Sequence, residues 1–443
     1  MTAQIFDFLD ALTWESIPKA AQERAKLSLL DLIGVGFSGR STELSRIICA
    51  HAQASFGGAR SMLFAPGQAS APGVALAGGM TIDSIDAHDG WNAAKGHVGC
   101  GLFPALYALA PDALSGAQFL TAFVAGYELG GRLAVTLHDA AGDYHPSGAW
   151  VAVAVALAGG HMAGLRGTAL ARAAGIAEYH GPRSQMMRCI DHPTMVKDGS
   201  GWGAMAGVSA VELAQAGFTG APALTLSGPH WDDLGTHWQM SEQYYKNYPV
   251  CRWAQPPVEA CLTIQRTHGF RAEDIAAIHI TTFHESTRLA TTAPETTEEA
   301  QYSTAFPVAL ALAHGRLGPA EVQGEMLFDP QVRRLAGVLT MGEDDEANAL
   351  FPHRRSAKAT VTLSGGQSFK SDWHDAVWDP RSPATEADIV GKFMDYAAPV
   401  IGPGRAEEVV TTVMALDTQP AAALFARITE EDAPRFQAVQ SNR

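Results

Sequence analysis

The segment DAHDGWNAAKGHVGCG, residues 86–101, concentrates side chains that can transfer protons or hold charge. It contains Asp86, His88, Asp89 and His97 and runs directly into a glycine-rich, apolar stretch. Carboxylates and imidazoles in one loop are compatible with acid–base catalysis, with metal binding, or with an ordinary solvated loop. The spacing matches neither HExxH nor a paired-cysteine motif, so we predict no metal site there.

The same arrangement occurs three times: a cationic or proton-transferring side chain stands before a predicted helix of small residues. His97 precedes GCGLFPALYALA, His145 precedes PSGAWVAVAVALAGG, and Lys197 precedes DGSGWGAMAG. A helix N-terminus exposes unpaired N–H groups and a partial positive charge, which favour carboxylate or phosphate. If the three helix starts converge, they form a site for an anion with several carboxylates. If they do not, each is ordinary helix capping.

Two further stretches supply cations near these loops. Residues 178–199 contain Arg188. Its planar guanidinium suits either a substrate carboxylate at a pocket wall or an ion pair with an acidic residue of a surface loop. Residues 244–262 place Lys246 and Arg252 among aromatic residues and prolines. That composition favours a closed substrate pocket, a domain hinge, or both.

Composition excludes several classes of function. The chain has 443 residues, 47% of them hydrophobic, and a net charge of −15. No basic stripe is visible, so we predict neither nucleic-acid binding nor attachment to an anionic membrane. The apolar run at residues 149–165 is short and rich in alanine and glycine, which predicts a buried helix instead of a membrane span. The N-terminus lacks a signal-peptide pattern, and we predict a cytoplasmic protein.

Cysteine spacing and cofactor motifs add further exclusions. The five cysteines are scattered without a CxxC pair, so neither a disulfide framework nor a zinc ribbon is indicated. No GxGxxG motif follows a predicted strand, and no GxxxxGK[ST] or GxSxG motif is present. The sequence therefore gives no support for a nucleotide cofactor.

Periodicity predicts the elements that must position these residues. Helical spacing of apolar residues continues to about residue 268, and then AEDIAAIHITTF alternates like a strand. KATVTLSGGQSFKSDW reads as two strands around a Gly-Gly turn. We predict a mainly α protein with a large all-helical domain from residues 1–268 and 393–443. A smaller α+β lid domain, residues 269–392, is inserted into it.

These segments, together with YYKNYPVCRWAQPPVEACL and AQYSTAFPVALALAHG, resemble the MmgE/PrpD family and follow its order over most of the chain. The resemblance implies a helical domain, an α+β lid, a cleft between them, a homodimer and no cofactor. It also implies an enzyme of small polycarboxylates. By position, the residues that match the family's catalytic set are Asp86, His97, His145, Lys197 and Lys246.

The chain also departs from the family pattern. His88 and Gly90 replace a common aspartate and threonine, Cys251 stands where decarboxylating members have a histidine, and Phe306 replaces a common lid tyrosine. Because the histidine and the tyrosine are replaced, we do not predict decarboxylation. The residues expected to contact the substrate are His88, Trp91, Arg188, Cys251, Arg252 and Phe306.

The sequence therefore predicts a cofactor-independent lyase of the hydro-lyase type, acting on a small polycarboxylate. A base removes the proton next to a carboxylate, and nearby donors stabilise the resulting anion. His145 is the expected base and His97 the expected proton donor, although the reverse assignment fits equally well. Asp86 would orient a histidine, while Lys197 and Lys246 would bind carboxylates with help from Arg188. The alternatives are an epimerase or isomerase using the same step, and a non-catalytic carboxylate-binding protein.

Overall fold

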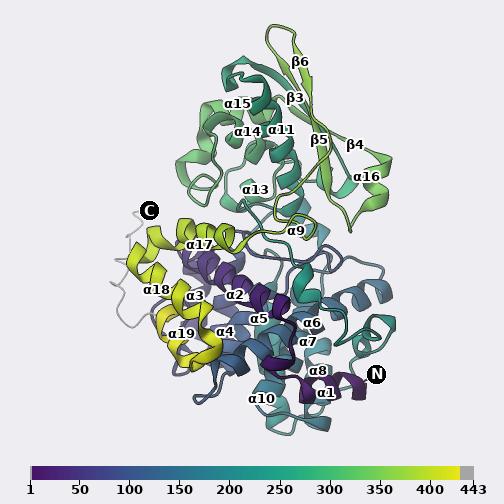
Figure 1. Cartoon of the computed structure of the whole chain (residues 1–443), viewed down its shortest axis with the longest axis vertical. Coiled ribbons are helices and arrows are strands. Elements are labelled where there is room, and N and C mark those ends of the chain that lie inside the picture. The colour runs from purple at the N-terminus through teal and green to yellow at the C-terminus, as the bar shows by residue number, and fades with distance from the viewer. Residues whose placement is uncertain (1, 430–443) are drawn as a thin grey trace.

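The structure is a computed structural model that describes residues 2–429 of the chain. Its elements form two parts, which we call the helical part and the α+β part (Figure 1). Each part packs around one large hydrophobic core. The helices of the helical part are α1 (Thr2–Ala11), α2 (Lys19–Gly39), α3 (Glu43–Ser55), α4 (Ala71–Asp83), α5 (Gly99–Leu109), α6 (Gly116–Ala140), α7 (Gly148–Met162), α8 (Gly167–His180), α10 (Ser200–Gln215), α17 (Glu386–Ile401), α18 (Pro403–Met414) and α19 (Ala421–Ile428). A small hairpin, β1 (Arg60–Ser61) with β2 (Gln68–Ala69), lies beside them.

The α+β part contains a sheet with the strand order β4-β3-β5-β6, and β7 also pairs with β5. β3 pairs in parallel with β4 and antiparallel with β5, which in turn pairs antiparallel with β6 and β7. Its strands are β3 (Ile275–Thr282), β4 (Leu339–Glu343), β5 (Ser356–Leu363), β6 (Ser368–Lys370) and β7 (His374–Asp375). Its helices are α9 (Met187–Asp191), α11 (Gln255–His268), α12 (His284–Thr287), α13 (Thr297–Gln301), α14 (Ala305–His314), α15 (Pro330–Gly337) and α16 (Asp345–Leu350).

Short 3₁₀ helices join these elements in both parts. They are Trp14–Ser16, Leu224–Leu226, Pro229–Trp231, Gln239–Glu242, Arg252–Ala254, Ala272–Asp274, Gly324–Phe328 and Leu416–Thr418.

Small residues allow the central helices of the helical part to pack at close range. A Cβ atom on Gly203 of α10 would lie 2.3 Å from the Gly148 carbonyl oxygen at the start of α7. A Cβ atom on Gly101 of α5 would lie 2.8 Å from the Ser200 carbonyl oxygen at the start of α10. The three helix starts predicted from sequence are therefore in direct contact, because glycine leaves room for neighbouring backbone.

The structure confirms the mainly α fold and the predicted strands. In β3, Ile278, Ile280 and Thr282 are buried, as the alternation predicted. The apolar run at residues 149–165 lies largely in the buried helix α7. Within residues 2–429, no helix combines the length and the apolar character needed to cross a membrane.

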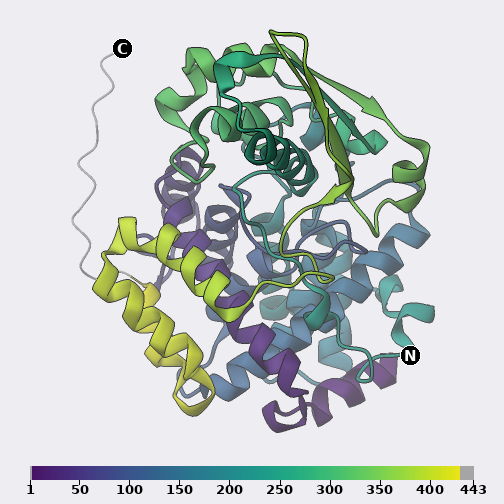
Figure 2. The same cartoon turned by 45° about the horizontal axis from the view of Figure 1, so that its top comes forward.

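One helix lies at each of the two domain boundaries predicted from sequence, and the two helices pack with different parts of the structure. Helix α11, before the boundary at residue 268, contributes Val258, Cys261 and Ile264 to the core of the α+β part. Helix α17 begins before residue 393 and packs along α2 (Figure 2). Both helices are amphipathic, and periodicity alone does not reveal which core an amphipathic face joins. Residues 430–443 of the predicted helical domain lie outside the described residues.

A buried ion pair joins the two distant chain segments that form α2 and α17. The Lys392 Nζ lies 2.6 Å from the Asp31 Oδ1 and donates a second hydrogen bond, 2.6 Å long, to the Ala87 carbonyl oxygen. The side chains are 4% and 0% exposed. Lys392 therefore connects the C-terminal helices to the loop that contains Asp86.

We predict that Lys392→Met destabilises the protein strongly, because it leaves the Asp31 carboxylate buried without a counter-charge. Loss of one partner of a buried pair costs about 3–5 kcal/mol, which urea unfolding followed by circular dichroism would measure. The control is Lys19→Met, since the Lys19–Glu23 pair on α2 is 75% and 63% exposed. An exposed pair contributes about 0–1 kcal/mol, so equal effects of the two substitutions would contradict the prediction.

Candidate functional site

A small cavity lies where the helical part meets the α+β part, and we call it the junction cavity. Its volume is about 30 Å³. Loops of the helical part supply Asp86, Lys95, His97 and Tyr144, whereas Met186, Ile190, Cys251, Trp253 and Tyr302 belong to the core of the α+β part or contact it. The remaining lining residues are Asp198, Tyr244, Lys246, Arg252 and Arg355.

Unusual backbone geometry marks the loops around the junction cavity. Asp86, Lys95 and Lys197 have φ angles of 47°, 54° and 49°, in the left-handed region that non-glycine residues rarely adopt. Asp86 and Lys95 line the cavity, and Lys197 precedes the lining residue Asp198. Such strained residues persist only where their surroundings hold them, and they concentrate at functional sites.

The central charged contact of the cavity joins Asp86 and Lys246. The Lys246 Nζ lies 2.5 Å from the Asp86 Oδ1 and also donates to the Asp86 carbonyl oxygen at 2.9 Å. Burial alone would raise the pKa of Asp86, but Lys246, Lys197 and His88 together hold it below its usual value. Burial opposes the charge on Lys246 as well, yet Asp86 raises the pKa of the ammonium. Both groups are therefore charged near neutral pH.

His97 is held as a neutral imidazole with one nitrogen committed to the backbone. Its Nδ1 lies 2.5 Å from the Asp89 carbonyl oxygen, and because a carbonyl only accepts, Nδ1 is the protonated nitrogen. Burial, followed by the charges of His88 and Lys246, lowers the pKa of His97 well below its usual value. The Nε2 lone pair is then free, which is the state that a general base requires.

Gly90 explains part of the departure from the family pattern. A Cβ atom at this position would lie 2.6 Å from the His97 Nδ1 and 2.6 Å from the Tyr244 Oη. Gly90 also pairs with Tyr244 through two backbone hydrogen bonds of 3.1 and 2.8 Å. Glycine therefore allows the loop to pack flat against His97 and Tyr244.

Positive side chains outnumber negative ones in the lining of the junction cavity by four to two. Lys95, Lys246, Arg252 and Arg355 contribute to it, and Tyr144, Tyr244 and Tyr302 add hydroxyl groups. Burial lowers the pKa of Arg252 to about 10, which still leaves it charged at neutral pH. This combination of cations and hydroxyl donors suits an anion with more than one carboxylate.

Seven of the eleven residues predicted from sequence lie in or against the junction cavity. Asp86, His97, Lys246, Cys251 and Arg252 line it. Lys197 is next to it, because its Nζ donates to the Gln301 Oε1 and lies 4.6 Å from the centre of the Tyr302 ring. The ring of His88 contacts that of His97 edge-on with centres 4.4 Å apart, and its Nε2 lies 3.3 Å from the Asp83 Oδ1.

The other four predicted residues do not line the junction cavity. His145 is half-buried and its Nδ1 lies 2.7 Å from the Asp143 carbonyl oxygen. The indole of Trp91 donates to Glu242 at 2.9 Å. Arg188 is exposed beside a separate hollow, and Phe306 is fully buried in the core of the α+β part.

Several lining residues were missed by the sequence analysis. Asp198 directly follows the predicted Lys197, and Lys95 stands two positions before the predicted His97, so a signal for both existed. Tyr302 lies in the quoted segment AQYSTAFPVALALAHG, before the position where the family commonly has a tyrosine. Arg355 has no motif around it, and only the fold brings it to the cavity.

One buried group in the described part of the chain has donor atoms close enough to share a metal ion. The ligand atoms of Asp83, Asp86 and His88 lie within 4.8 Å of one another. The position next to the Asp86 Oδ1 is already taken by the Lys246 ammonium. A divalent cation there would meet a positive charge at close range, which the geometry does not favour.

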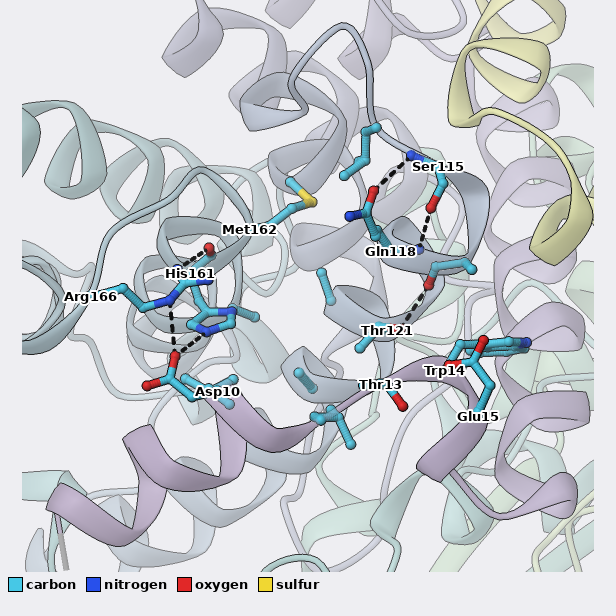
Figure 3. Close-up of a pocket in the computed structure, with 17 residues that line it drawn as sticks. Asp10, Thr13, Trp14, Glu15, Ser115, Gln118, Thr121, His161, Met162 and Arg166 are labelled. Carbon is cyan, nitrogen blue, oxygen red and sulfur yellow. Dashed lines mark hydrogen bonds and ion pairs between the residues drawn. The ribbon is translucent and has the colours of Figure 1, made fainter.

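A larger hollow, about 640 Å³ in volume, lies elsewhere, between α1, α6 and α7 (Figure 3). In it, Asp10 pairs with both His161 and Arg166 at 2.9 Å. Ser115 and Gln118 form the capping box of α6. The polar groups of this hollow thus stabilise local structure, whereas those of the junction cavity line one small space.

Two family models match successive parts of this chain. The MmgE/PrpD N-terminal domain matches residues 3–232, and the MmgE/PrpD C-terminal domain matches residues 248–418. Cis-aconitate decarboxylase of Mus musculus is 24% identical over 434 residues, which cover 89% of this chain and 86% of that protein. Cis-aconitate decarboxylase of Homo sapiens is 31% identical over 169 residues, covering 36% of this chain and 35% of that protein. The chain belongs to the MmgE/PrpD family.

Proposed function

We propose that this protein is a cofactor-independent hydro-lyase of a small polycarboxylate, with its active site in the junction cavity. The observation that carries the proposal is a neutral, half-buried His97 beside Lys246 in a cavity to which four cations contribute. Family membership and relatives named for a reaction of cis-aconitate support a substrate with several carboxylates.

In the proposed reaction, the cations of the cavity bind the substrate's carboxylates and His97 removes the proton from the carbon next to one of them. The pKa of such a proton falls when the developing enediolate is stabilised, and Lys246 and Arg252 supply that stabilisation. Asp86 holds the Lys246 ammonium in place at 2.5 Å. We assign the base to His97 over His145, because His97 lines the cavity and His145 does not.

Substrate entry requires movement of the α+β part in this proposal. A volume of about 30 Å³ corresponds to about one water molecule, far less than a tricarboxylate occupies. The walls come from both parts, so separation of the parts would open the cavity. The α+β part would then act as a lid, and its closure would exclude water from the reaction.

We predict that His97→Asn strongly slows proton abstraction. The assay is solvent deuterium exchange, followed by proton NMR in D₂O with citrate, L-malate, D-malate and cis-aconitate as probes. Loss of a general base lowers the rate by about 10²–10⁴-fold. The matched control is His51→Asn, at an exposed histidine of α3, which is expected to keep the full rate. Retained exchange in His97→Asn together with loss of exchange in His145→Asn would reverse the assignment.

The same assay separates the three candidate functions. Exchange accompanied by loss or addition of water supports the hydro-lyase. Exchange without any change in water content supports an epimerase. Tight binding of these acids with no exchange in the wild-type protein supports a carboxylate-binding protein and contradicts both enzymatic proposals.

We predict an unusual pH dependence for the exchange step. Because burial, His88 and Lys246 lower the pKa of His97, the imidazole stays unprotonated at pH values where an ordinary histidine becomes charged. The exchange rate is therefore expected to stay constant as the pH falls from about 7.5 to about 6, across the usual histidine pKa of about 6.5. A decline that follows ordinary histidine titration would contradict the proposed state of His97.

A further inference from the structure

Two carboxyl groups line the junction cavity, and their surroundings differ. Asp86 pairs with Lys246. Asp198 accepts a hydrogen bond from the Ser147 hydroxyl through its Oδ2, and within residues 2–429 no cation lies within ion-pair distance of it. Asp198 is only 3% exposed. A buried carboxyl without a counter-charge is more stable in the neutral form.

The charges of Asp83 and Asp86 favour the protonated form of Asp198, and the hydrogen bond from Ser147 opposes it. The groups that face Asp198 are Asp83, Asp86, Cys100, Tyr144, Ser147, Cys189 and Tyr302. None is a cation, and the ammonium of neighbouring Lys197 is engaged by Gln301 and Tyr302 instead. Burial, followed by the charge of Asp83, raises the pKa of Asp198 to about 8.

Ser147 links this carboxyl to the proposed base. Its Oγ accepts the backbone N–H of His97 at 2.9 Å and donates its own proton to the Asp198 Oδ2. The Gly148 N–H donates to the Asp198 carbonyl oxygen at 3.2 Å, which fixes the backbone as well. With Oδ2 occupied as an acceptor, the carboxyl proton belongs on Oδ1. An acid and a base are thus held at one cavity by a single serine.

We propose that Asp198 is the general acid of the dehydration, donating its proton to the departing hydroxyl of the substrate. This inference rests on the proposed hydro-lyase function. His97 takes the proton from carbon, the C–H electron pair becomes the new C=C bond, and the C–O bond breaks. The hydroxyl leaves with the Asp198 proton as water, leaving an imidazolium and a carboxylate. Transfer of the His97 proton to Asp198 through water restores the starting state.

The first experiment uses Asp198→Asn, which keeps the size of the side chain and an oxygen that can accept from Ser147. Loss of water from L-malate or citrate is expected to fall at least hundredfold, in line with the loss of a general acid. Deuterium exchange at the same carbon is expected to stay within about threefold of wild type, because His97 is intact. The control is Asp112→Asn at an exposed aspartate, expected to leave both rates unchanged.

A change of leaving group provides a sharper comparison. Fluoride departs with little need of a proton, so fluorosuccinate bypasses the acid that L-malate requires. The defect of Asp198→Asn is expected to shrink to about threefold with fluorosuccinate, if the lost contribution is the acid alone. An equal defect with both substrates, or the loss of exchange together with dehydration, indicates a structural role and overturns the proposal. Wild-type dehydration rates in the variant overturn it as well.

Infrared spectroscopy tests the acid without any substrate. The difference spectrum between wild type and Asp198→Asn is expected to show a protonated carboxyl at pH 7 that titrates near pH 8. An ionised Asp198 at pH 7 overturns the inference. If wild type acts on none of the probe acids, the proposed function fails, whereas the infrared result still decides the state of Asp198.

Discussion

The ion pair between Asp86 and Lys246 holds together the parts of the chain that form the junction cavity. Both side chains are almost fully buried, at 4% and 1% exposure, so each would be costly without the other. Asp86 adopts a left-handed backbone conformation, which is costly for a residue with a side chain. The second hydrogen bond of Lys246, to the Asp86 carbonyl oxygen, accounts for how that conformation is maintained.

The loop that contains Asp86 is also held by helix α17 of the C-terminal segment. Lys392 bonds the Ala87 carbonyl oxygen while pairing with Asp31 of α2. Residues near positions 31, 86, 246 and 392 thus form one buried network of charges. This arrangement gives a physical reason for building the helical part from both ends of the chain, because the last helices stabilise the loop that holds His97 and Asp86.

The charged residues that line the cavity are mostly positive, whereas the net charge of the whole protein is negative. The chain carries a net charge of −15, yet four cations line the cavity beside Asp86 and Asp198. Burial and the local charges give His97 a low pKa and Asp198 a high one. Near neutral pH the histidine is therefore held neutral and the aspartic acid protonated, and such tuning of pKa values by the surroundings is a recurring means of performing acid–base chemistry.

Much of this arrangement could be predicted from the sequence, and the remainder depends on tertiary contacts. Periodicity predicted the mainly α fold and strand β3, and the motif positions predicted Asp86, His97 and Lys246. No local pattern could show that Ser147 bridges His97 and Asp198, or that Arg355 reaches the cavity. Phe306 illustrates the limit: its helix α14 turns the ring into the core, and the residue of this segment that lines the cavity is Tyr302.

The central claim, that the junction cavity binds a polycarboxylate next to His97, is tested most directly by a crystal structure with tricarballylate. This tricarboxylate has no hydroxyl to lose, so it should remain bound intact. The account predicts that its carboxylates contact Lys246, Arg252 and Arg355. A methylene carbon of the ligand should face the His97 Nε2. The α+β part should be displaced from the bound ligand or closed over it. Tricarballylate bound only in the hollow beside Asp10 and Arg166, with the junction cavity unchanged, would contradict the account.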